Sequence, residues 1–248
     1  KVSSLVDLDK YNLPILTKTE WCASVLEKIP SEYLLNDEIE FSTILRSNKR
    51  KSLQLKRILD IFTSLFLILF TFPIVILTII IIFIEDGLPI FYIQKRHGLN
   101  NKIIKLPKFR SMLKTAEKDG PTWAKKNDNR VTKIGKYLRL LRIDEIPQLI
   151  LVLKGEMSIV GPRPERPEID ELLNKKIHLY NLRYKVLPGI SGWAQVNYPY
   201  GSSIDDSRKK LSYDLFYIKN QSFLLDLLII LKTVKRVLTA SGSNPNEK

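Results

Sequence analysis

The sequence is poor in the residues that cross-link small domains or bind metals. With one cysteine, Cys22, among 248 residues, no disulfide can form within the chain, and no thiolate-rich metal site is available. The two histidines, His97 and His178, are too few for a histidine-based zinc centre by themselves. Internal repeats and low-complexity tracts are also missing. These absences exclude disulfide scaffolds and zinc fingers.

The beginning of the chain lacks the features of a protein start. The first residue is Lys1, and no segment there combines the charged, apolar and small-residue regions of a signal peptide. We therefore expect a piece of a longer protein, in which residues 1–48 are the tail of a preceding domain and a linker. Residues 243–248 are expected to form a disordered polar tail.

Acidic residues are in the minority. The chain has 26 Asp and Glu against 40 Lys and Arg, which gives a formal net charge of +14. Such a field attracts polyanions, which include nucleic acid, anionic lipid headgroups and sugar nucleotides. A solvated basic surface has the same composition, so charge alone does not choose among these partners.

Charge is almost missing from residues 58–84, which hold a single ionised side chain, Asp60. A helix over these 27 residues would be roughly 40 Å long at about 1.5 Å per residue, enough to cross a hydrocarbon core of about 30 Å. A soluble domain of this size does not ordinarily bury so long an apolar helix. We therefore expect the segment to enter a membrane.

Basic residues flank this apolar run on both sides, at residues 49–57 and 95–96. Both flanks therefore have the composition of cytoplasmic segments, and the positive-inside rule chooses no direction across the membrane. Pro73, in the middle of the run, removes one helical hydrogen bond and disfavours helix at Phe72. We expect residues 49–86 to form a basic flank and a re-entrant helix that returns to the same face. A kinked spanning helix is the alternative.

Two short β-rich segments follow, at residues 89–94 and 103–106, and the Gly-containing loop between them predicts a hairpin. A helical stretch is expected to begin at residues 108–112 and to contain Glu117. Basic side chains cluster in this region: Lys95, Arg96, Lys102, Lys105, Lys108 and Arg110.

Residues 132–153 have the pattern of a basic amphipathic helix, because Ile134, Leu138 and Leu141 recur at helical spacing among Lys and Arg. The apolar stripe fits either a protein core or a lipid interface. Pro147 indicates the first turn of a new helix or a kink.

Two neighbouring carboxylates, Asp144 and Glu145, follow the basic stripe. Neighbours on a helix point about 100° apart, so the two side chains cannot do the same job on one atom. One can attack or accept a proton while the other holds a metal, a division of roles that phosphoryl transfer needs. Taken by itself, the dipeptide is explained more simply as an acidic pair that favours a helix dipole.

Prolines stand on both sides of Arg163 and present its guanidinium on a rigid loop. A rigid arginine suits bidentate binding of phosphate, although a stiff turn in which Arg163 pairs with Glu165 has the same sequence. Residues 222–236 predict a second cation-ended amphipathic helix, which is too short and too charged to span a membrane.

Together, these stretches resemble one family, the bacterial sugar transferases, also called monotopic phosphoglycosyl transferases. The resemblance covers about residues 56–242. The matching segments, in family order, are Lys56-Arg-Ile-Leu-Asp60, Lys108-Phe-Arg-Ser-Met112, Asp144-Glu-Ile-Pro-Gln148, Gly161-Pro-Arg-Pro-Glu165, Pro188-Gly-Ile-Ser-Gly-Trp-Ala-Gln195 and Tyr213-Asp-Leu-Phe-Tyr-Ile-Lys219.

The resemblance implies an α-rich α+β fold with a re-entrant, monotopic membrane helix, amphipathic interfacial helices and a small β-hairpin. It implies a cytosolic catalytic domain at residues 87–242, held at the bacterial inner membrane. Residues 1–48 resemble the linker of long-form members of the family.

The resemblance also implies a reaction, the first membrane step of bacterial polysaccharide biosynthesis. Asp144 would attack the sugar-proximal phosphorus of a UDP-sugar and release UMP, and a polyprenyl phosphate would then take the phosphosugar from the carboxylate. Glu145 would coordinate Mg²⁺, the expected cofactor. The side chains expected to bind the substrate and its phosphates are Lys108, Arg110, Arg163 and Asp214.

The chain departs from the family pattern in places. Phe72 precedes Pro73 where many members have Ser, and Thr71 lies one position earlier, so the side chain that stabilises the bend is not identified. Residues 197–203 lack the arginine that short-form members have there, and Leu187 stands where Arg or Lys is common.

Two other classes of function fit the sequence less well. A membrane-tethered assembly or regulatory protein without activity is disfavoured because both carboxylates and the arginine loop are intact. A nucleic-acid partner is not expected, because no zinc finger, helix-turn-helix pattern or aromatic-basic platform is evident. The sequence does not identify the sugar, and a homo-oligomer stays an open expectation.

Overall fold

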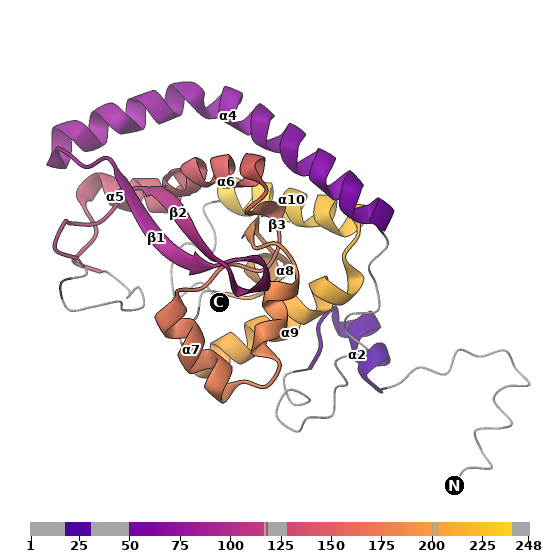
Figure 1. The fold of residues 1–248 in the computed structure, drawn as a ribbon. Helices are drawn as coiled ribbons and strands as arrows, with labels where there is room; N and C mark the ends of the chain where they lie inside the picture. Colours follow the sequence, from indigo (N-terminus) through magenta and orange to yellow (C-terminus); the bar gives the residue numbers. More distant parts are fainter. Residues whose placement is uncertain are drawn as a thin grey trace, which may run out of the picture.

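The computed structural model describes residues 18–30, 50–116, 118, 128–199, 201 and 203–239. The described part is mostly helical with one small antiparallel hairpin, as the sequence predicts, and it adds a second short strand pair (Figure 1). Its elements, with 3-10 helices labelled η, are α2 (Lys18–Leu26), α4 (Arg50–Asp86), β1 (Phe91–His97), η3 (Leu99–Asn101), β2 (Ile103–Phe109), α5 (Lys133–Leu140), η4 (Ile143–Gln148), α6 (Leu149–Lys154), β3 (Ser158–Val160), α7 (Pro167–Lys176), η5 (Tyr180–Lys185), β4 (Gly189–Ser191), α8 (Trp193–Asn197), α9 (Ile204–Asn220) and α10 (Phe223–Leu238).

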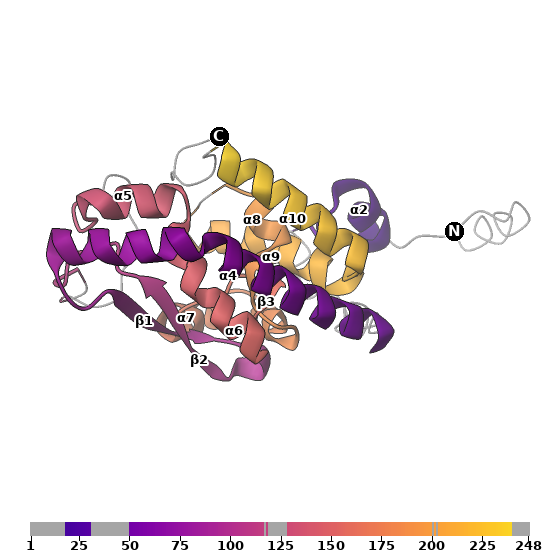
Figure 2. The same cartoon turned by 90° about the horizontal axis from the view of Figure 1, so that it is seen from above.

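The long apolar helix α4 arches over the rest of the protein and lies across α5, η4, α6, β3 and α10 (Figures 1 and 2). It is one continuous helix that contains Pro73. Pro73 has no N–H to donate to the carbonyl of Leu69, and the Thr71 hydroxyl donates to the carbonyl of Leu67 at 2.7 Å. Both features bend a helix. Thr71, two residues before Pro73, is thus a polar side chain that accompanies the curvature.

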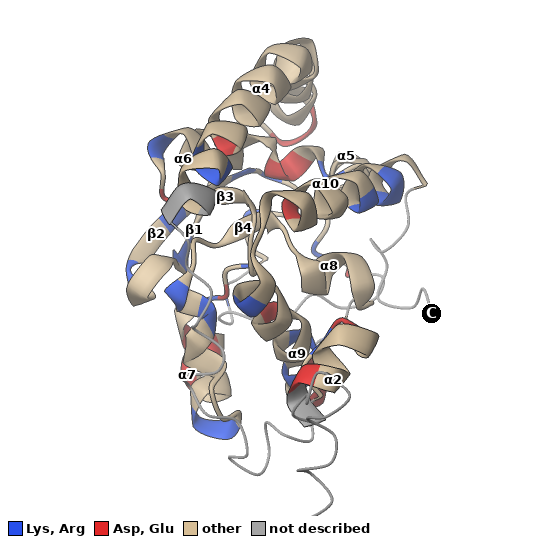
Figure 3. Ribbon diagram, turned by 90° about the vertical axis from the view of Figure 1, so that its right-hand side faces the viewer, with Lys and Arg blue, Asp and Glu red and all other residues tan. Residues whose placement is uncertain are grey.

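The middle of α4 faces away from the protein. The segment Leu53–Asp86 is long and apolar enough to cross a membrane, and only 11% of its most apolar window is buried. Leu69, for example, is 78% exposed. The outward part of the arch also carries no charged residue in Figure 3. A core helix of a soluble domain would be mostly buried, so that interpretation does not fit α4.

Buried polar contacts tie the first part of α4 to the domain beneath it. The Lys56 ammonium lies 2.8 Å from the Asp226 carboxylate of α10. Two residues of β3 donate to Asp60 Oδ1, the hydroxyl of Ser158 and the backbone N–H of Ile159, both at 2.9 Å. Unpaired charges are costly to bury, so these contacts fix where the helix begins on the domain.

The last turn of α4 contacts the same domain. Asp86 lies 3.0 Å from the guanidinium of Arg110, and Glu85 accepts a hydrogen bond from the backbone N–H of Ile134 in α5 at 3.1 Å. Ile82 is buried in a small core with Ile90, Phe109 and Leu138. The two ends of the arch therefore meet one folded body.

The hairpin pairs β1 and β2 in antiparallel register, with Gln94 opposite Leu106 and Arg96 opposite Ile104. It is longer than the two predicted segments. The helix expected from residue 108 is wrong, because Lys108 and Phe109 complete β2 and residues 110–116 form turns and a bridge from Met112 to Val131. Glu117 lies outside the described residues. Pairing with β1 outweighs the local helical pattern here.

The predicted helix over residues 132–153 is divided into α5, η4 and α6. Thr132 caps α5 by accepting from the N–H of Gly135 at 2.9 Å. Arg142 then adopts a left-handed conformation, with φ of 55°, which interrupts the helix before η4. Pro147 lies inside η4, and α6 ends at Gly155, whose φ is +81°. The acidic pair is therefore on a 3-10 turn between two helices.

The strands β3 and β4 pair in parallel beneath α4 and α10. Their backbones approach closely at Gly161 and Gly189. A Cβ built on Gly189 would lie 2.0 Å from the N of Gly161, so only glycine fits. This packing places the loop that follows β3 next to the start of β4, where the N–H of Gly189 donates to the carbonyl of Pro162 at 2.9 Å.

The main core lies among α6, β3, η5, α8 and α9 and includes Val152, Met157, Trp193 and Leu215. Ile29, in the segment predicted to be linker, is part of the same core and is bonded to α9 through the N–H of Ile29 and the carbonyl of Ser212 at 3.0 Å. The Trp193 indole also donates to the carbonyl of Glu27. Residues 27–29 thus pack with the domain that holds the acidic pair.

Candidate active site

The acidic pair is buried, with Asp144 8% and Glu145 7% exposed. Strand β2 packs against η4 from one side, and α4 and α5 contact it from others. The left-handed turn at Arg142 brings the pair into this position. Two adjacent buried carboxylates repel each other, so the surroundings must supply positive charge.

Three cations surround Glu145. Lys108, on β2, donates to Oε1 at 3.1 Å, and Arg163 donates to both carboxylate oxygens. Arg142 lies 3.8 Å from Oε2. Burial by itself raises the pKa of Glu145, but the charges of Arg163 and Lys108 outweigh burial and hold that pKa well below its usual range. Glu145 is therefore an ionised carboxylate that holds these three cations in place.

Asp144 has a different environment. Within the described part of the chain, no side chain or backbone group donates a hydrogen bond to its carboxylate. Burial raises the pKa of Asp144 to about 6, and the negative charge of Glu145 adds to this effect, while Lys108 and Arg139 oppose it. A carboxylate with a raised pKa and free lone pairs is more nucleophilic than a saturated one. The reactive role therefore suits Asp144 better than Glu145.

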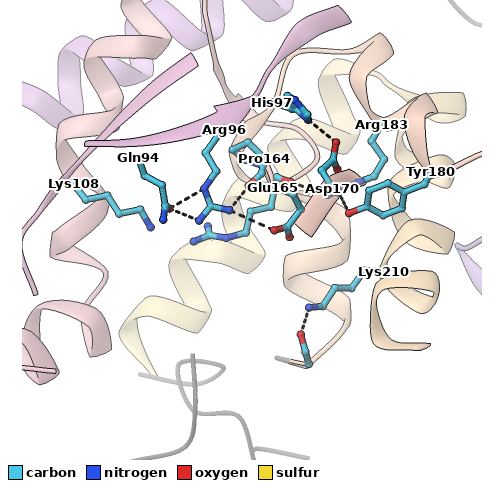
Figure 4. Close-up of polar contacts among 12 residues, drawn as sticks. Gln94, Arg96, His97, Lys108, Pro164, Glu165, Asp170, Tyr180, Arg183 and Lys210 are labelled. Carbon is cyan, nitrogen blue, oxygen red and sulfur yellow. Dashed lines mark hydrogen bonds and ion pairs between the residues drawn. The ribbon is translucent and has the colours of Figure 1, made fainter. Parts of the chain in front are cut away.

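A buried network holds the backbone of the arginine loop. The guanidinium of Arg183, on η5, donates to the carbonyl of Arg163 at 2.7 Å and to the Asp214 carboxylate at 2.8 Å. It also donates to the Tyr180 hydroxyl (Figure 4). Asp214, on α9, thus supports the loop through Arg183 and does not contact Glu145. Asp214 therefore has the contacts of a positioning group, and a direct role in substrate binding stays a prediction.

Arg96 is a site residue that the sequence pattern predicts only as a member of a general basic cluster. Its guanidinium donates to Oε1 of Gln94 and to the carbonyl of Pro164 at 3.1 Å (Figure 4). With Lys108 and Arg163 it lines one small pocket, which we call the cationic pocket; its other lining residues are Leu106, Gln148 and Pro164. Strand alternation would have found it, because the register places Arg96 and Lys108 on the same face of the hairpin.

Arg110 lies apart from this pocket. Its guanidinium donates to the carbonyls of Asp86 and Gly87, at 3.1 and 2.7 Å, and pairs with the Asp86 carboxylate. The structure therefore brings together Asp144, Glu145, Lys108 and Arg163 of the predicted set, while Arg110 fastens the end of α4. A role for Arg110 in phosphate binding stays a prediction.

The donor set of the pair suits a magnesium ion that is shared with a phosphorylated substrate. In such sites Mg²⁺ takes one or two protein carboxylates and completes its shell with phosphate oxygens and water. Among the described residues, no group of three or more His, Cys, Asp or Glu side chains is arranged to hold a metal. Glu145 would therefore hold the ion together with the phosphate oxygens of the substrate. At Glu145 the longest of the present contacts, to Arg142 at 3.8 Å, is the one most readily displaced.

Comparisons with known proteins place the chain in one family. The sequence model of the family described as bacterial sugar transferase matches residues 51–240. A UDP-N-acetylgalactosamine-undecaprenyl-phosphate N-acetylgalactosaminephosphotransferase of Aeromonas hydrophila is 42% identical over 189 residues, which are 76% of this chain and 45% of that protein. A UDP-glucose:undecaprenyl-phosphate glucose-1-phosphate transferase of Escherichia coli is 41% identical over 183 residues, which are 73% of this chain and 39% of that protein.

A shorter relative, the uncharacterized sugar transferase EpsL of Bacillus subtilis, is 41% identical over 192 residues, which are 76% of this chain and 89% of that protein. The chain thus spans less than half of the two longer relatives and most of the shorter one. The region matched by the family model contains the acidic pair, the cationic pocket and all but the first residue of α4.

Proposed function

The chain belongs to the bacterial sugar transferase family, and on that premise we propose that it transfers a sugar 1-phosphate from a UDP-sugar to a polyprenyl phosphate. The observation that carries this proposal is the difference between the two carboxylates. Glu145 is held by Lys108, Arg163 and Arg142, whereas Asp144 beside it has free lone pairs and a pKa of about 6. Asp144 would thus be a nucleophile that lies next to a group of cations able to bind phosphate.

The reaction takes two displacements at one phosphorus. In the first, an oxygen of Asp144 bonds to the sugar-proximal phosphorus of the UDP-sugar, and the bond from that phosphorus to the UMP oxygen breaks. In the second, an oxygen of the polyprenyl phosphate bonds to the same phosphorus, and the bond to Asp144 breaks. The lipid then carries a diphosphate sugar, and the carboxylate is restored.

The cationic pocket supplies the charge that this chemistry needs. Arg96, Lys108 and Arg163 present guanidinium and ammonium groups where a diphosphate would develop negative charge. Burial lowers the pKa values of Arg96 and Lys108, which means that it disfavours their charged forms. An anion bound beside them stabilises those charged forms. A bound Mg²⁺, held by Glu145, would further offset the negative phosphate oxygens.

The test of this function is a single-turnover reaction without lipid. We expect a member of a UDP-sugar panel to release one UMP per protein and to leave a phosphosugar on the chain, seen as a mass increase of the intact protein. Added polyprenyl phosphate should remove the adduct. The relatives are named for different sugars, so the panel should include glucose and N-acetylgalactosamine. If no UDP-sugar yields UMP with Mg²⁺ present, the proposed function is wrong.

The arrangement of α4 favours a re-entrant helix at the cytosolic face of the bacterial inner membrane. Its two ends contact one folded body through Lys56 and Asp60 at the beginning and Asp86 at the end. A spanning helix would place these ends on opposite faces, with roughly 30 Å of hydrocarbon between them. The exposed middle of the arch then lies in the bilayer, and the acidic pair lies at its boundary.

Thiol labelling tests this placement. In a Cys22→Ser background, we expect Gln54→Cys and Lys95→Cys to react with an impermeant maleimide in inverted vesicles and to be protected in intact spheroplasts. Both positions are exposed and lie on either side of the arch. Leu69→Cys is the control and should stay unlabelled in both preparations because lipid covers it. Labelling of residues 54 and 95 from opposite faces would establish a spanning helix.

A further inference from the structure

A second pocket lies beside the acidic pair, on the side where α4 and α10 meet the domain. Its walls come from α4, η4, α6, β4, α8 and α10, and we call it the apolar pocket. The residues that line it are Leu67, Arg142, Glu145, Ile146, Leu149, Ile190, Ser191, Gln195, Val196, Thr233, Arg236 and Val237. Glu145 lines this pocket and is bonded to Lys108 and Arg163 of the cationic pocket, so the two pockets meet at Glu145.

The two pockets differ in chemistry. The cationic pocket is lined mainly by charged and polar groups, whereas half of the residues that line the apolar pocket are aliphatic, among them Leu67, Ile146 and Val237. Leu67 belongs to the arch, whose exposed apolar surface continues from it through Leu69 and Phe70. An apolar chain that leaves this pocket along α4 would therefore stay in contact with apolar surface.

Two arginines stand in the apolar pocket without a full set of anionic partners. Arg236 donates through Nη1 to the carbonyl of Gln195 at 2.9 Å, and no carboxylate of the described residues lies within salt-bridge distance of it. Among the described residues, Glu145 is the single carboxylate within salt-bridge distance of Arg142, at 3.8 Å, and Glu145 is already shared with Lys108 and Arg163. Each guanidinium has five N–H donors in a fork that suits phosphate oxygens. The pocket therefore has positive charge in excess.

From this juxtaposition we infer that the apolar pocket seats the phosphate end and the first apolar units of the acceptor lipid, a long-chain prenyl monophosphate. Arg236 and Arg142 hold its phosphate, and Leu67, Ile146 and Val237 contact its chain. This assignment rests on the proposed function for the identity of the lipid. It places acceptor recognition on α10, an element that carries none of the reactive groups.

Direct binding of a short probe tests the inference without relying on catalysis. We expect farnesyl monophosphate to bind the detergent-solubilised protein in isothermal titration, and farnesol, which lacks the phosphate, to bind at least about tenfold more weakly. Arg236→Gln should weaken farnesyl monophosphate roughly tenfold to a hundredfold, the usual effect of losing a hydrogen bond to a charged group. Arg236→Lys, which keeps the charge, should recover part of the affinity.

Lys235→Gln is the matched control. Lys235 lies on the same turn of α10, is exposed and does not line the pocket, so its removal lowers the charge of the helix equally. Its affinity for the probe should equal that of the unaltered protein. Equal binding by Arg236→Gln and Lys235→Gln would overturn the inference, as would equal binding of farnesol and farnesyl monophosphate.

Inorganic phosphate as a competitor distinguishes an anion site from a lipid site. Displacement of the farnesyl probe by millimolar phosphate alone, with no dependence on chain length among prenyl phosphates, would show that the aliphatic walls contribute nothing and would contradict the inference. Failure of the proposed function is seen separately, in the UMP-release reaction of the unaltered protein. The two results are therefore independent.

Discussion

Replacement of Asp144 by asparagine is expected to remove the covalent adduct and to lower UMP release by at least about 10³-fold, as losses of a nucleophile do. The amide keeps the shape of the side chain but cannot displace UMP. We do not expect a loss of thermal stability, because no hydrogen bond from the described residues is made to this carboxylate. Its folded-state pKa is raised, so its ionisation at neutral pH opposes folding.

The measurements for this variant are UMP release and intact mass, with a melting curve in the same detergent. Asp205→Asn is the control, because it makes the same chemical change outside the site. Asp205 lies on α9, and its side chain is 59% exposed. Near-normal turnover of Asp144→Asn would show that another group attacks phosphorus. An adduct that persists on the variant would have the same meaning.

The largest effect on stability is expected at the pair formed by Arg183 and Asp214. Both side chains are almost fully buried, and their contact is 2.8 Å long. Asp214→Leu leaves a buried guanidinium without its counter-ion, and such losses cost about 3–5 kcal/mol. We expect a matching fall in the free energy of unfolding, measured by urea titration in detergent. The carbonyl of Arg163 would also lose a firmly held donor, so activity should fall.

A double-mutant cycle separates the charge from the packing. Arg183→Met should be destabilising as well, whereas the double variant Arg183→Met with Asp214→Leu should recover part of the loss, because no unpaired charge is left. The exposed pair of Lys209 with Asp205, at 2.7 Å, is the surface comparison, and its removal should cost about 0–1 kcal/mol. Additive losses in the double variant would show that the two charges are not coupled.

Local pattern predicted much of the fold. The apolar run became α4, the β-rich segments became the hairpin, and the last amphipathic stretch became α10, capped by Ser222. The sequence pattern did not predict that residues 132–153 divide into three elements. Arg142 adopts a left-handed conformation there, and the position has no glycine or asparagine to indicate it. Tertiary contacts around the acidic pair hold that turn, and such contacts are not visible in a local pattern.

The same limit applies to the site. The motif around Lys108 contains two cations, and only the structure distinguishes them, since Lys108 faces η4 from β2 and Arg110 turns toward the end of α4. The partners of Glu145 come from 37 and 18 residues away in the chain. Arg183 lies in a stretch with no recognisable pattern, and its role follows only from its position between Asp214 and the arginine loop.

The arch of α4 has a practical consequence. Ile82 covers Ile90 and Phe109, and Leu67 and Ile68 pack on the main core. Trimming the helix would strip these side chains of their cover and leave Asp226 without the ammonium of Lys56. The inward face of α4 is therefore part of the packed structure of the enzyme, and the helix cannot be removed as a membrane anchor could. A water-soluble version would need the outward face of α4 redesigned and its inward face kept.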